Sequence, residues 1–168
     1  PGKRVDDDLN RASVPLASRF QGKQINEQAN PDAKIQALSN MNSKAKDHAS
    51  VGGEEFKAYA FDYWQYLDSM VFWEGLVPSA DVIDAAHRNG VPIYGTLFYN
   101  WSSSIKDQER FAETLKEDSE GSKTFPIARK LVDLAKYYGF DGYFINQETT
   151  GNLVEPLGPK LRDFLLYT

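Results

Sequence analysis

The chain has 168 residues, of which 41% are hydrophobic, 26% charged and 13% aromatic, with a formal net charge of −5 and no cysteine. This length suits one domain, and the acidic balance argues against a nucleic-acid partner. The absence of cysteine excludes disulfide scaffolds, thiolate nucleophiles and cysteine-ligated zinc, and the presence of only two histidines argues against a histidine-rich metal centre.

The N-terminal part of the sequence is polar and shows no regular pattern. We therefore expect an irregular lead-in over residues 1–30, followed by one domain over residues 31–168. The start has neither an initiator methionine nor the apolar stretch of a signal peptide, so we expect a processed or excised piece. No apolar run approaches the length of about 18 residues that a membrane-spanning helix needs, so we expect no membrane span.

Beyond the lead-in, short apolar runs alternate with amphipathic stretches. The short runs predict strands, and stretches with apolar residues three and four positions apart predict helices. In chain order, we expect a strand at 34–40, a helix at 54–67, a strand at 69–74, a helix at 80–89, a strand at 91–99, helices at 106–116 and 126–138, a strand at 141–148 and a helix at 157–167.

The alternation of strands and helices predicts an α/β fold of parallel βαβ units. Two architectures compete: an open doubly wound sheet, and part of a (β/α)8 TIM barrel. No glycine-rich phosphate-binding turn follows any predicted strand, which disfavours a nucleotide-binding open sheet. Polar residues at the ends of the predicted strands favour the barrel, because barrel active sites gather at that face. They are Asn40, Glu74, Asn100, Asn146 and Glu148.

The last predicted strand carries a candidate catalytic pair. Side chains alternate along a strand, so Asn146 and Glu148 share one face, with Cα atoms about 6–7 Å apart. A carboxyl group beside an amide can transfer a proton while the amide orients a substrate. Taken alone, however, an Asn-x-Glu triplet more often satisfies backbone groups of a neighbouring loop.

Three longer motifs add context to this pair. They are Lys136-Tyr-Tyr-Gly-Phe-Asp-Gly-Tyr-Phe-Ile-Asn-Gln-Glu148, Tyr63-Trp-Gln-Tyr-Leu-Asp68, and Ile83-Asp-Ala-Ala-His-Arg-Asn-Gly-Val91 followed by Gly95-Thr96. In order and spacing, over roughly residues 31–167, they resemble glycoside hydrolase family 85, the endo-β-N-acetylglucosaminidases. The resemblance is strongest to the bacterial, streptococcal-type members of that family.

This resemblance implies a fold and a reaction. The family's catalytic pair follows the fourth strand, and a whole barrel takes about 250 residues, so we expect about four βα units from the N-terminal half of a (β/α)8 barrel. The implied reaction is retaining, substrate-assisted hydrolysis of the GlcNAc-β1,4-GlcNAc core of N-glycans. Glu148 would be the general acid and later the base, and Asn146 would orient the 2-acetamido group that forms an oxazolinium intermediate. We expect apolar neighbours to enclose Glu148, because burial favours a protonated carboxyl group. If the strands pair in sequence order, the candidate neighbours are Phe144, Trp73 and Tyr99.

Residues near the ends of the second and third predicted strands are candidate sugar contacts. Aromatic planes can stack on the apolar faces of sugar rings, and polar side chains can bind sugar hydroxyls. For any single residue in this set, packing in the core or in a loop is an equally open interpretation. The candidates are Trp73, Glu74, Phe98, Tyr99, Asn100 and Trp101.

The resemblance also implies partners and a location. We expect N-linked glycans of glycoproteins as substrates, the rest of the barrel from the parent chain, no metal or other cofactor, and an extracellular or cell-surface location in a bacterium. Two other classes stay open. A non-catalytic carbohydrate-binding barrel would bind glycans without cleaving them, and a small open α/β interaction domain would show a switch point in its strand order.

Overall fold

The sheet holds four strands whose spatial order follows the sequence, β1-β2-β3-β4. These strands are β1 Gln36–Ser39, β2 Ser69–Phe72, β3 Ile93–Tyr99 and β4 Gly142–Gln147. β1 pairs with β2 and β2 with β3, both in parallel, with Ala37 opposite Met70 and Val71 opposite Tyr94. Because the described strand order has no switch point, it argues against the open doubly wound alternative.

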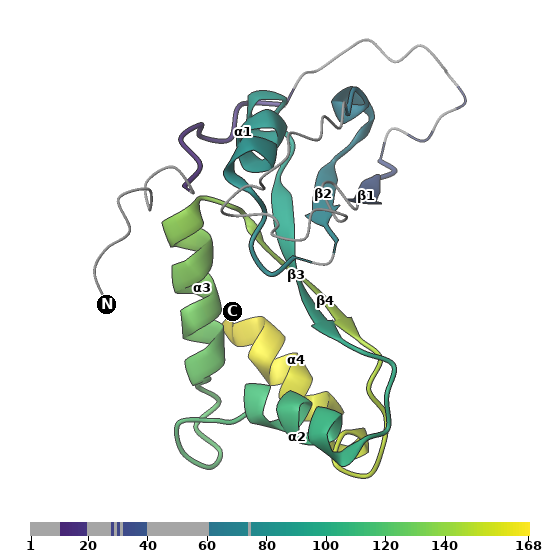
Figure 1. Cartoon of the computed structure of the whole chain (residues 1–168), viewed down its shortest axis with the longest axis vertical. Helices are drawn as coiled ribbons and strands as arrows, with labels where there is room; N and C mark the ends of the chain where they lie inside the picture. The colour runs from purple at the N-terminus through teal and green to yellow at the C-terminus, as the bar shows by residue number, and fades with distance from the viewer. Residues whose placement is uncertain (1–10, 20–27, 29, 31, 40–60, 74) are drawn as a thin grey trace, which may run out of the picture. The chain divides into compact units, whose positions relative to one another are not determined.

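This computed structural model describes residues 11–19, 28, 30, 32–39, 61–73 and 75–168 (Figure 1). The chain divides into two compact units. The first comprises residues 1–96 and 137–144, and the second comprises residues 97–136 and 145–168. None of the described helices is both long and apolar enough to cross a bilayer.

Among the described residues, four α-helices occur where amphipathic patterns predict them: α1 Ala80–Arg88, α2 Ile105–Thr114, α3 Pro126–Tyr138 and α4 Gly158–Tyr167. Local signals explain their ends. The Ser104 hydroxyl caps α2 by accepting a hydrogen bond from the Asp107 N–H at 3.2 Å. Proline opens α3 at Pro126, and Gly139 follows its last residue with a φ of 86°, which favours glycine.

One predicted helix differs from the structure. The expectation of a helix over 54–67 falls partly outside the described residues, and in the described part only a short 3-10 helix forms, η2 Trp64–Tyr66. Bonds to the start of β1 explain this difference. The Asp68 N–H donates to the Ile35 carbonyl at 2.8 Å, and the Asp68 carboxylate accepts from the Ile35 N–H at 2.8 Å. The chain is therefore drawn into strand geometry directly after η2.

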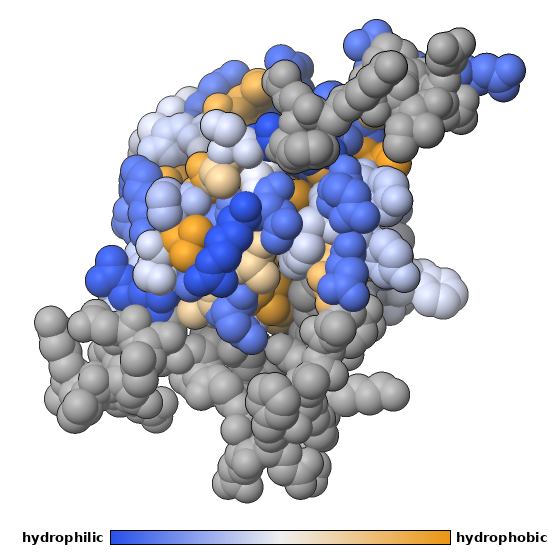
Figure 2. Space-filling view, turned by 90° about the horizontal axis from the view of Figure 1, so that it is seen from above, coloured by the Kyte–Doolittle hydropathy of each residue, from blue (hydrophilic) through white to orange (hydrophobic). Residues whose placement is uncertain are grey.

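The core of the first unit forms between the strands and α1, which lies beside them in Figure 1. Met70, Val71 and Ile93 from the strands are fully buried, as is Ile83 from α1. Close approach of the chain requires glycine at position 95, since a Cβ there would lie 2.1 Å from the Leu76 carbonyl oxygen. In the view of Figure 2, hydrophilic residues cover most of the described surface and hydrophobic residues show through in separate places.

The lead-in residues 11–19 contain no helix or strand, yet hydrogen bonds hold them within the first unit. The Asp84 carboxylate of α1 accepts from the Ser13 N–H at 2.9 Å and the Val14 N–H at 3.0 Å. Further along, the Ala17 N–H donates to the His87 carbonyl at 2.9 Å. This part of the lead-in is therefore attached to α1 by polar contacts.

The second unit is built from α2, most of α3 and α4. Phe111, Phe125 and Phe164, one from or beside each helix, are almost fully buried. The Phe125 and Phe164 rings meet edge to face with centroids 5.4 Å apart. This helical core supports the ends of β3 and β4, from which the candidate site residues extend.

Candidate functional site

The end of β4 lies beside the end of β3, and backbone hydrogen bonds join the two. The Glu148 N–H donates to the Tyr99 carbonyl at 3.0 Å, and the Thr150 N–H donates to the Ser102 carbonyl at 2.9 Å. These bonds keep the chain extended past the last residue of β4. Asn146 and Glu148 therefore keep the alternation that places both side chains on one face.

Asn146 has an unsatisfied amide. Its Nδ2 atom is buried and has no hydrogen-bond partner among the described residues. A buried polar group without a partner costs about 1–3 kcal/mol, so such groups are rare and often functional. The nitrogen and oxygen of an amide exchange places by rotation, so this position can offer a donor or an acceptor to a ligand.

Glu148 is exposed, and the described residues do not form the apolar enclosure expected around it. Each of the three aromatic residues predicted as its neighbours has a ring contact with another residue. Trp73 and Phe144 contact each other in the first unit, with ring centroids 6.2 Å apart, and Tyr99 packs against α2. The Glu148 carboxyl group is accordingly open to solvent and to a ligand.

Tyr99 occupies a different place from the sugar contact that the sequence predicts. Its side chain is 2% exposed, its ring meets Phe111 edge to face at 5.0 Å, and its hydroxyl donates to the Thr114 hydroxyl at 2.7 Å. Burial raises the pKa of the Tyr99 phenol. The reason is alternation along β3: Tyr99 points toward α2, and its neighbour Phe98 points the other way.

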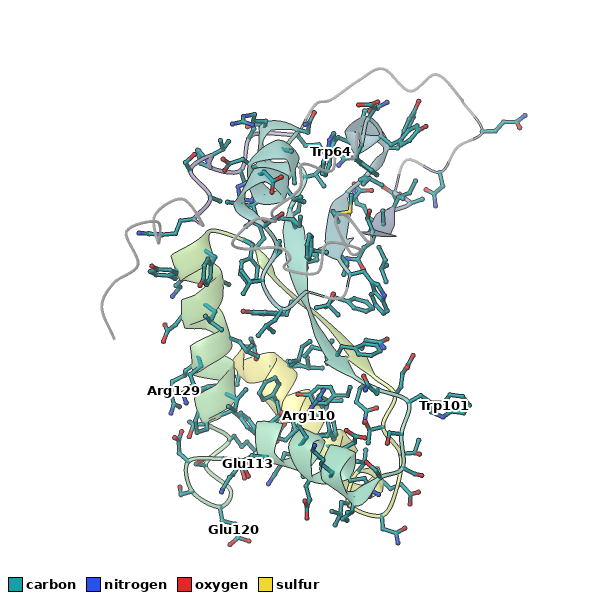
Figure 3. All side chains as sticks on the ribbon, in the orientation of Figure 1. Trp64, Trp101, Arg110, Glu113, Glu120 and Arg129 are labelled. Carbon is teal, nitrogen blue, oxygen red and sulfur yellow. The ribbon has the colours of Figure 1, made fainter. Side chains whose placement is uncertain are left out.

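The other predicted contacts have different exposures. Phe98 is 37% exposed and Asn100 is exposed, and Trp101, 86% exposed, projects from the loop after β3 (Figure 3). These three residues belong to the second unit, with Asn146 and Glu148, whereas Trp73 belongs to the first. Glu74 lies outside the described residues. The structure thus brings Phe98, Asn100 and Trp101 to the strand end that pairs with Glu148.

Sequence reasoning missed two buried polar residues that join the loops after β3 and β4. The Thr149 side chain is 2% exposed, and its hydroxyl donates to the Asn100 carbonyl at 2.9 Å. Gln108 of α2 is 8% exposed; its amide donates to the Ser103 carbonyl at 2.8 Å and accepts from the Leu153 N–H at 3.1 Å. Polar loop residues show no periodicity, and the only signal for Thr149 is its position directly after Glu148.

A separate surface cleft of about 760 Å³ lies in the second unit, between α2 and the segment that leads into α4. Four of its charged residues form ion pairs, Lys116 with Glu113 at 3.5 Å and Lys160 with Glu117 at 3.4 Å. None of the predicted site residues lines this cleft. Among the described residues, no three His, Asp or Glu side chains are grouped as ligands for a metal ion.

A family assignment follows from comparison with known proteins. The model of glycosyl hydrolase family 85 matches residues 39–168. The chain belongs to glycosyl hydrolase family 85. The predicted family resemblance is therefore confirmed, and with it membership in a family of glycosidases.

Individual members of family 85 agree with this assignment. The crystal structure of the glycoside hydrolase domain of Endo-D from Streptococcus pneumoniae R6 is 77% identical with a TM-score of 0.89, and the match covers 99% of this chain and 26% of that chain. The cytosolic endo-β-N-acetylglucosaminidase of Danio rerio is 32% identical over 159 residues, 92% of this chain and 21% of its own length. The cytosolic enzyme of Homo sapiens is 28% identical over 153 residues, 89% of this chain and 19% of its own length.

The match to a family 85 domain confirms the predicted fold class, an α/β TIM barrel of which this chain holds a part. The chain spans about a fifth of the length of the curated relatives named above. Four parallel-sheet strands in sequence order agree with a segment of such a barrel.

The predicted extracellular or cell-surface location is contradicted. The named family 85 relatives from Danio rerio, Gallus gallus and Homo sapiens are cytosolic enzymes. The prediction of a secreted protein is withdrawn for the same reason. Its basis was the bacterial resemblance, and motifs that identify a barrel fold carry no information on location.

Proposed function

We propose that this chain carries the catalytic pair of an endo-β-N-acetylglucosaminidase that hydrolyses the GlcNAc-β1,4-GlcNAc core of N-linked glycans. The observation that carries the proposal is the end of β4, where the exposed Glu148 follows Asn146 by two positions. The buried amide nitrogen of Asn146 has no hydrogen-bond partner among the described residues. Membership in family 85 and the names of its relatives support the same reaction.

The first step forms a cyclic intermediate from the substrate itself. The oxygen of the 2-acetamido group attacks the anomeric carbon, and the glycosidic C–O bond breaks as Glu148 gives its proton to the departing oxygen. The amide of Asn146 orients the acetamido group by accepting its N–H. Because positive charge grows on this nitrogen as the oxazolinium ring forms, the hydrogen bond strengthens toward the transition state.

The second step regenerates the sugar. Glu148, now a carboxylate, takes a proton from a water molecule whose oxygen attacks the anomeric carbon, and the ring C–O bond returns its electrons to the acetamido group. Two inversions leave the anomeric configuration retained. A single carboxyl group serves both steps, so no second carboxylate is needed beside Glu148. The exposure of Glu148 permits access by the leaving oxygen and by water.

Substrate contacts extend the proposal along the end of β3. Phe98, Asn100 and Trp101 follow one another there, and all three are exposed. We place sugar rings against Phe98 and Trp101 and a sugar hydroxyl on Asn100, all three in the second unit. Trp73, in the first unit, stays a separate predicted contact. The remaining barrel strands, supplied by the parent chain, would complete the enclosure of Glu148 that the described residues do not form. The lead-in over 1–30 and the barrel segment over 31–168 remain our proposed division of the chain.

The test is a cleavage assay on the longest natural protein that contains this chain, with a glycopeptide that carries an N-glycan core. We expect Glu148→Gln to lower kcat by about 10²–10⁴-fold, because it removes the proton donor and keeps the shape of the side chain. Glu155→Gln is the matched control, since Glu155 is an exposed glutamate that begins the short 3-10 helix η3 Glu155–Leu157, and its substitution should leave kcat unchanged.

Three outcomes separate the alternatives. Cleavage by Glu148→Gln at the wild-type rate would overturn the assignment of the acid. Glycan binding without turnover in the wild-type protein would favour the non-catalytic carbohydrate-binding barrel. Loss of turnover in Glu148→Gln with retained glycan binding supports the proposed function.

A further inference from the structure

The residue after Glu148 is buried, unlike the two residues beside it. Glu148 and Thr150 are exposed, whereas the Thr149 side chain between them is 2% exposed. Its hydroxyl donates to the Asn100 carbonyl at 2.9 Å, across the gap between the chain segments that follow β3 and β4. A buried threonine whose hydroxyl is fully used fixes both its own backbone and the partner loop.

A second bond acts on the same residue from β4. The Gln147 amide donates to the Thr149 carbonyl at 2.9 Å. Glu148 therefore stands between two residues that are bonded to each other, and its own N–H is bonded to the Tyr99 carbonyl at 3.0 Å. We call the Thr149 hydroxyl bond and the Gln147 amide bond the Thr149 tether.

The tether acts where the chain leaves the sheet. β4 ends at Gln147, and beyond it two backbone bonds, from the Glu148 N–H to the Tyr99 carbonyl and from the Thr150 N–H to the Ser102 carbonyl, continue the contact with the segment after β3. Residue 149 lies between these bonds, so its own bonds complete the support of the backbone that carries the Glu148 carboxyl group. In the reaction proposed above, one carboxyl group must reach the glycosidic oxygen and then the attacking water from the same place. Misplacement by about 1 Å costs as much as 10²-fold in rate, so the position of Glu148 needs support from outside the strand.

We infer that Thr149 is a positioning residue that holds the Glu148 carboxyl group in its proton-transfer geometry through the two bonds of the Thr149 tether together. The inference rests on the proposed function. Thr149 itself does not touch the substrate, because its side chain is buried on the side opposite to Glu148. Its main effect is therefore on proton transfer, and the bond to the Asn100 backbone adds a smaller effect on glycan binding.

The test compares Thr149→Val with Thr149→Ser in the longest natural protein that contains this chain. Valine keeps the branched shape and removes the hydroxyl donor, whereas serine keeps the donor. With a glycopeptide substrate, we expect kcat for Thr149→Val to fall by about 10–100-fold with KM within about twofold, and Thr149→Ser to stay close to wild type.

A second substrate separates positioning from simple structural damage. An aryl glycoside whose leaving group departs without a proton does not need the general acid in its first step. We expect Thr149→Val to release the aryl alcohol in the first turnover at close to the wild-type rate. An equal loss on both substrates would mean that Thr149 is only structural, and it would overturn the inference.

Thr96 provides the matched control. It is also a buried threonine, 4% exposed, whose hydroxyl donates to a backbone carbonyl, that of Phe72, at 2.7 Å. Thr96→Val should lower the melting temperature about as much as Thr149→Val, with kcat unchanged. A fall in kcat in Thr96→Val equal to that in Thr149→Val would also overturn the inference.

If Thr149→Val does not fold, Gln147→Leu removes the other bond of the tether at a half-buried position. The same loss, confined to the glycopeptide substrate, supports the inference, and a wild-type kcat overturns it. The control Glu148→Gln distinguishes failure of the proposed function from failure of the positioning role of Thr149. Activity in Glu148→Gln would refute the proposed function, whereas loss in Glu148→Gln with a wild-type Thr149→Val would refute only the tether.

Discussion

At the scale of single residues, the polar side chains at the end of β4 differ in whether their hydrogen bonds are satisfied. Thr149 has its hydroxyl bonded, whereas the Asn146 amide nitrogen is buried with no partner among the described residues. An unsatisfied group of this kind lowers the free energy of unfolding, and sites evolved for binding commonly tolerate that cost. The unpaired amide is therefore where function and stability should oppose each other.

Asn146→Leu tests this opposition. Leucine has a similar size and no polar atom, so we expect the free energy of unfolding to stay equal or rise by about 1 kcal/mol. Because the amide is also proposed to bind the acetamido group, kcat should fall by about 10²–10³-fold. Urea denaturation and the glycopeptide assay measure the two quantities. Asn152→Leu, at an exposed loop position, is the control and should show neither effect. Destabilisation by Asn146→Leu would show that the amide is already bonded in the folded protein.

At the scale of elements, one arginine joins three parts of the second unit. Arg129 of α3 donates to both carboxylate oxygens of Asp118, in the loop before α3, each at 2.7 Å (Figure 3). It also donates to the hydroxyl of Tyr167 on α4 at 3.1 Å. The hydrogen bonds from Arg129 lower the pKa of Asp118 from 3.8 to about 2. This forked contact is stronger than an ordinary surface ion pair because its geometry is fixed.

The lowered pKa predicts a pH dependence of stability. The folded-state pKa lies below the unfolded value, so the contribution is fully present above pH 3.8 and is lost as the pH falls through about 2. We expect Asp118→Asn to melt below wild type at pH 7, with the gap closing between about pH 4 and pH 2. Thermal melting at several pH values checks this. Glu120→Gln, in the same loop, should show a much smaller gap, and a gap for Asp118→Asn that is constant with pH would contradict the prediction.

At the scale of the whole molecule, the irregular lead-in belongs to the first compact unit. It contributes no helix or strand over residues 11–19, yet its backbone donates to α1 at several points. Asp84 alone accepts from the backbone of two successive residues, Ser13 and Val14, and from the Ser13 hydroxyl at 3.2 Å. Without the Asp84 carboxylate, three hydrogen-bond donors in this part of the lead-in would lose their acceptor.

Asp84→Ala should release the lead-in. Because a hydrogen bond to a charged group contributes about 1.5–3 kcal/mol, trypsin should cleave after Arg11 and Arg19 about tenfold faster than in wild type. Timed digestion with mass spectrometry of the fragments measures this. The control is Asp81→Ala, which removes an exposed carboxylate from the same helix. Equal cleavage rates in both variants would show that the Asp84 bonds do not hold the lead-in.

Much of the fold could be predicted because the apolar residues that form the core recur at regular spacing in the sequence. Apolar runs and three- or four-residue spacing place all four strands and the helices α1 to α4 within a few residues of their observed bounds. The described part of the predicted 54–67 helix was the exception, since the Asp68 bonds to Ile35 belong to a contact between distant segments. Local pattern cannot report a competing bond of that kind.

Motif order was sufficient to identify the family. Strand alternation predicts that Asn146 and Glu148 share one face. The burial of single side chains could not be predicted from the sequence in the same way, because it depends on which elements pack together. Tyr99 turned out to be a packing residue against α2, Glu148 an exposed one, and Thr149 a buried one. A sequence records which side chains share a face, and only the folded chain determines whether that face meets a helix, a neighbouring loop or solvent.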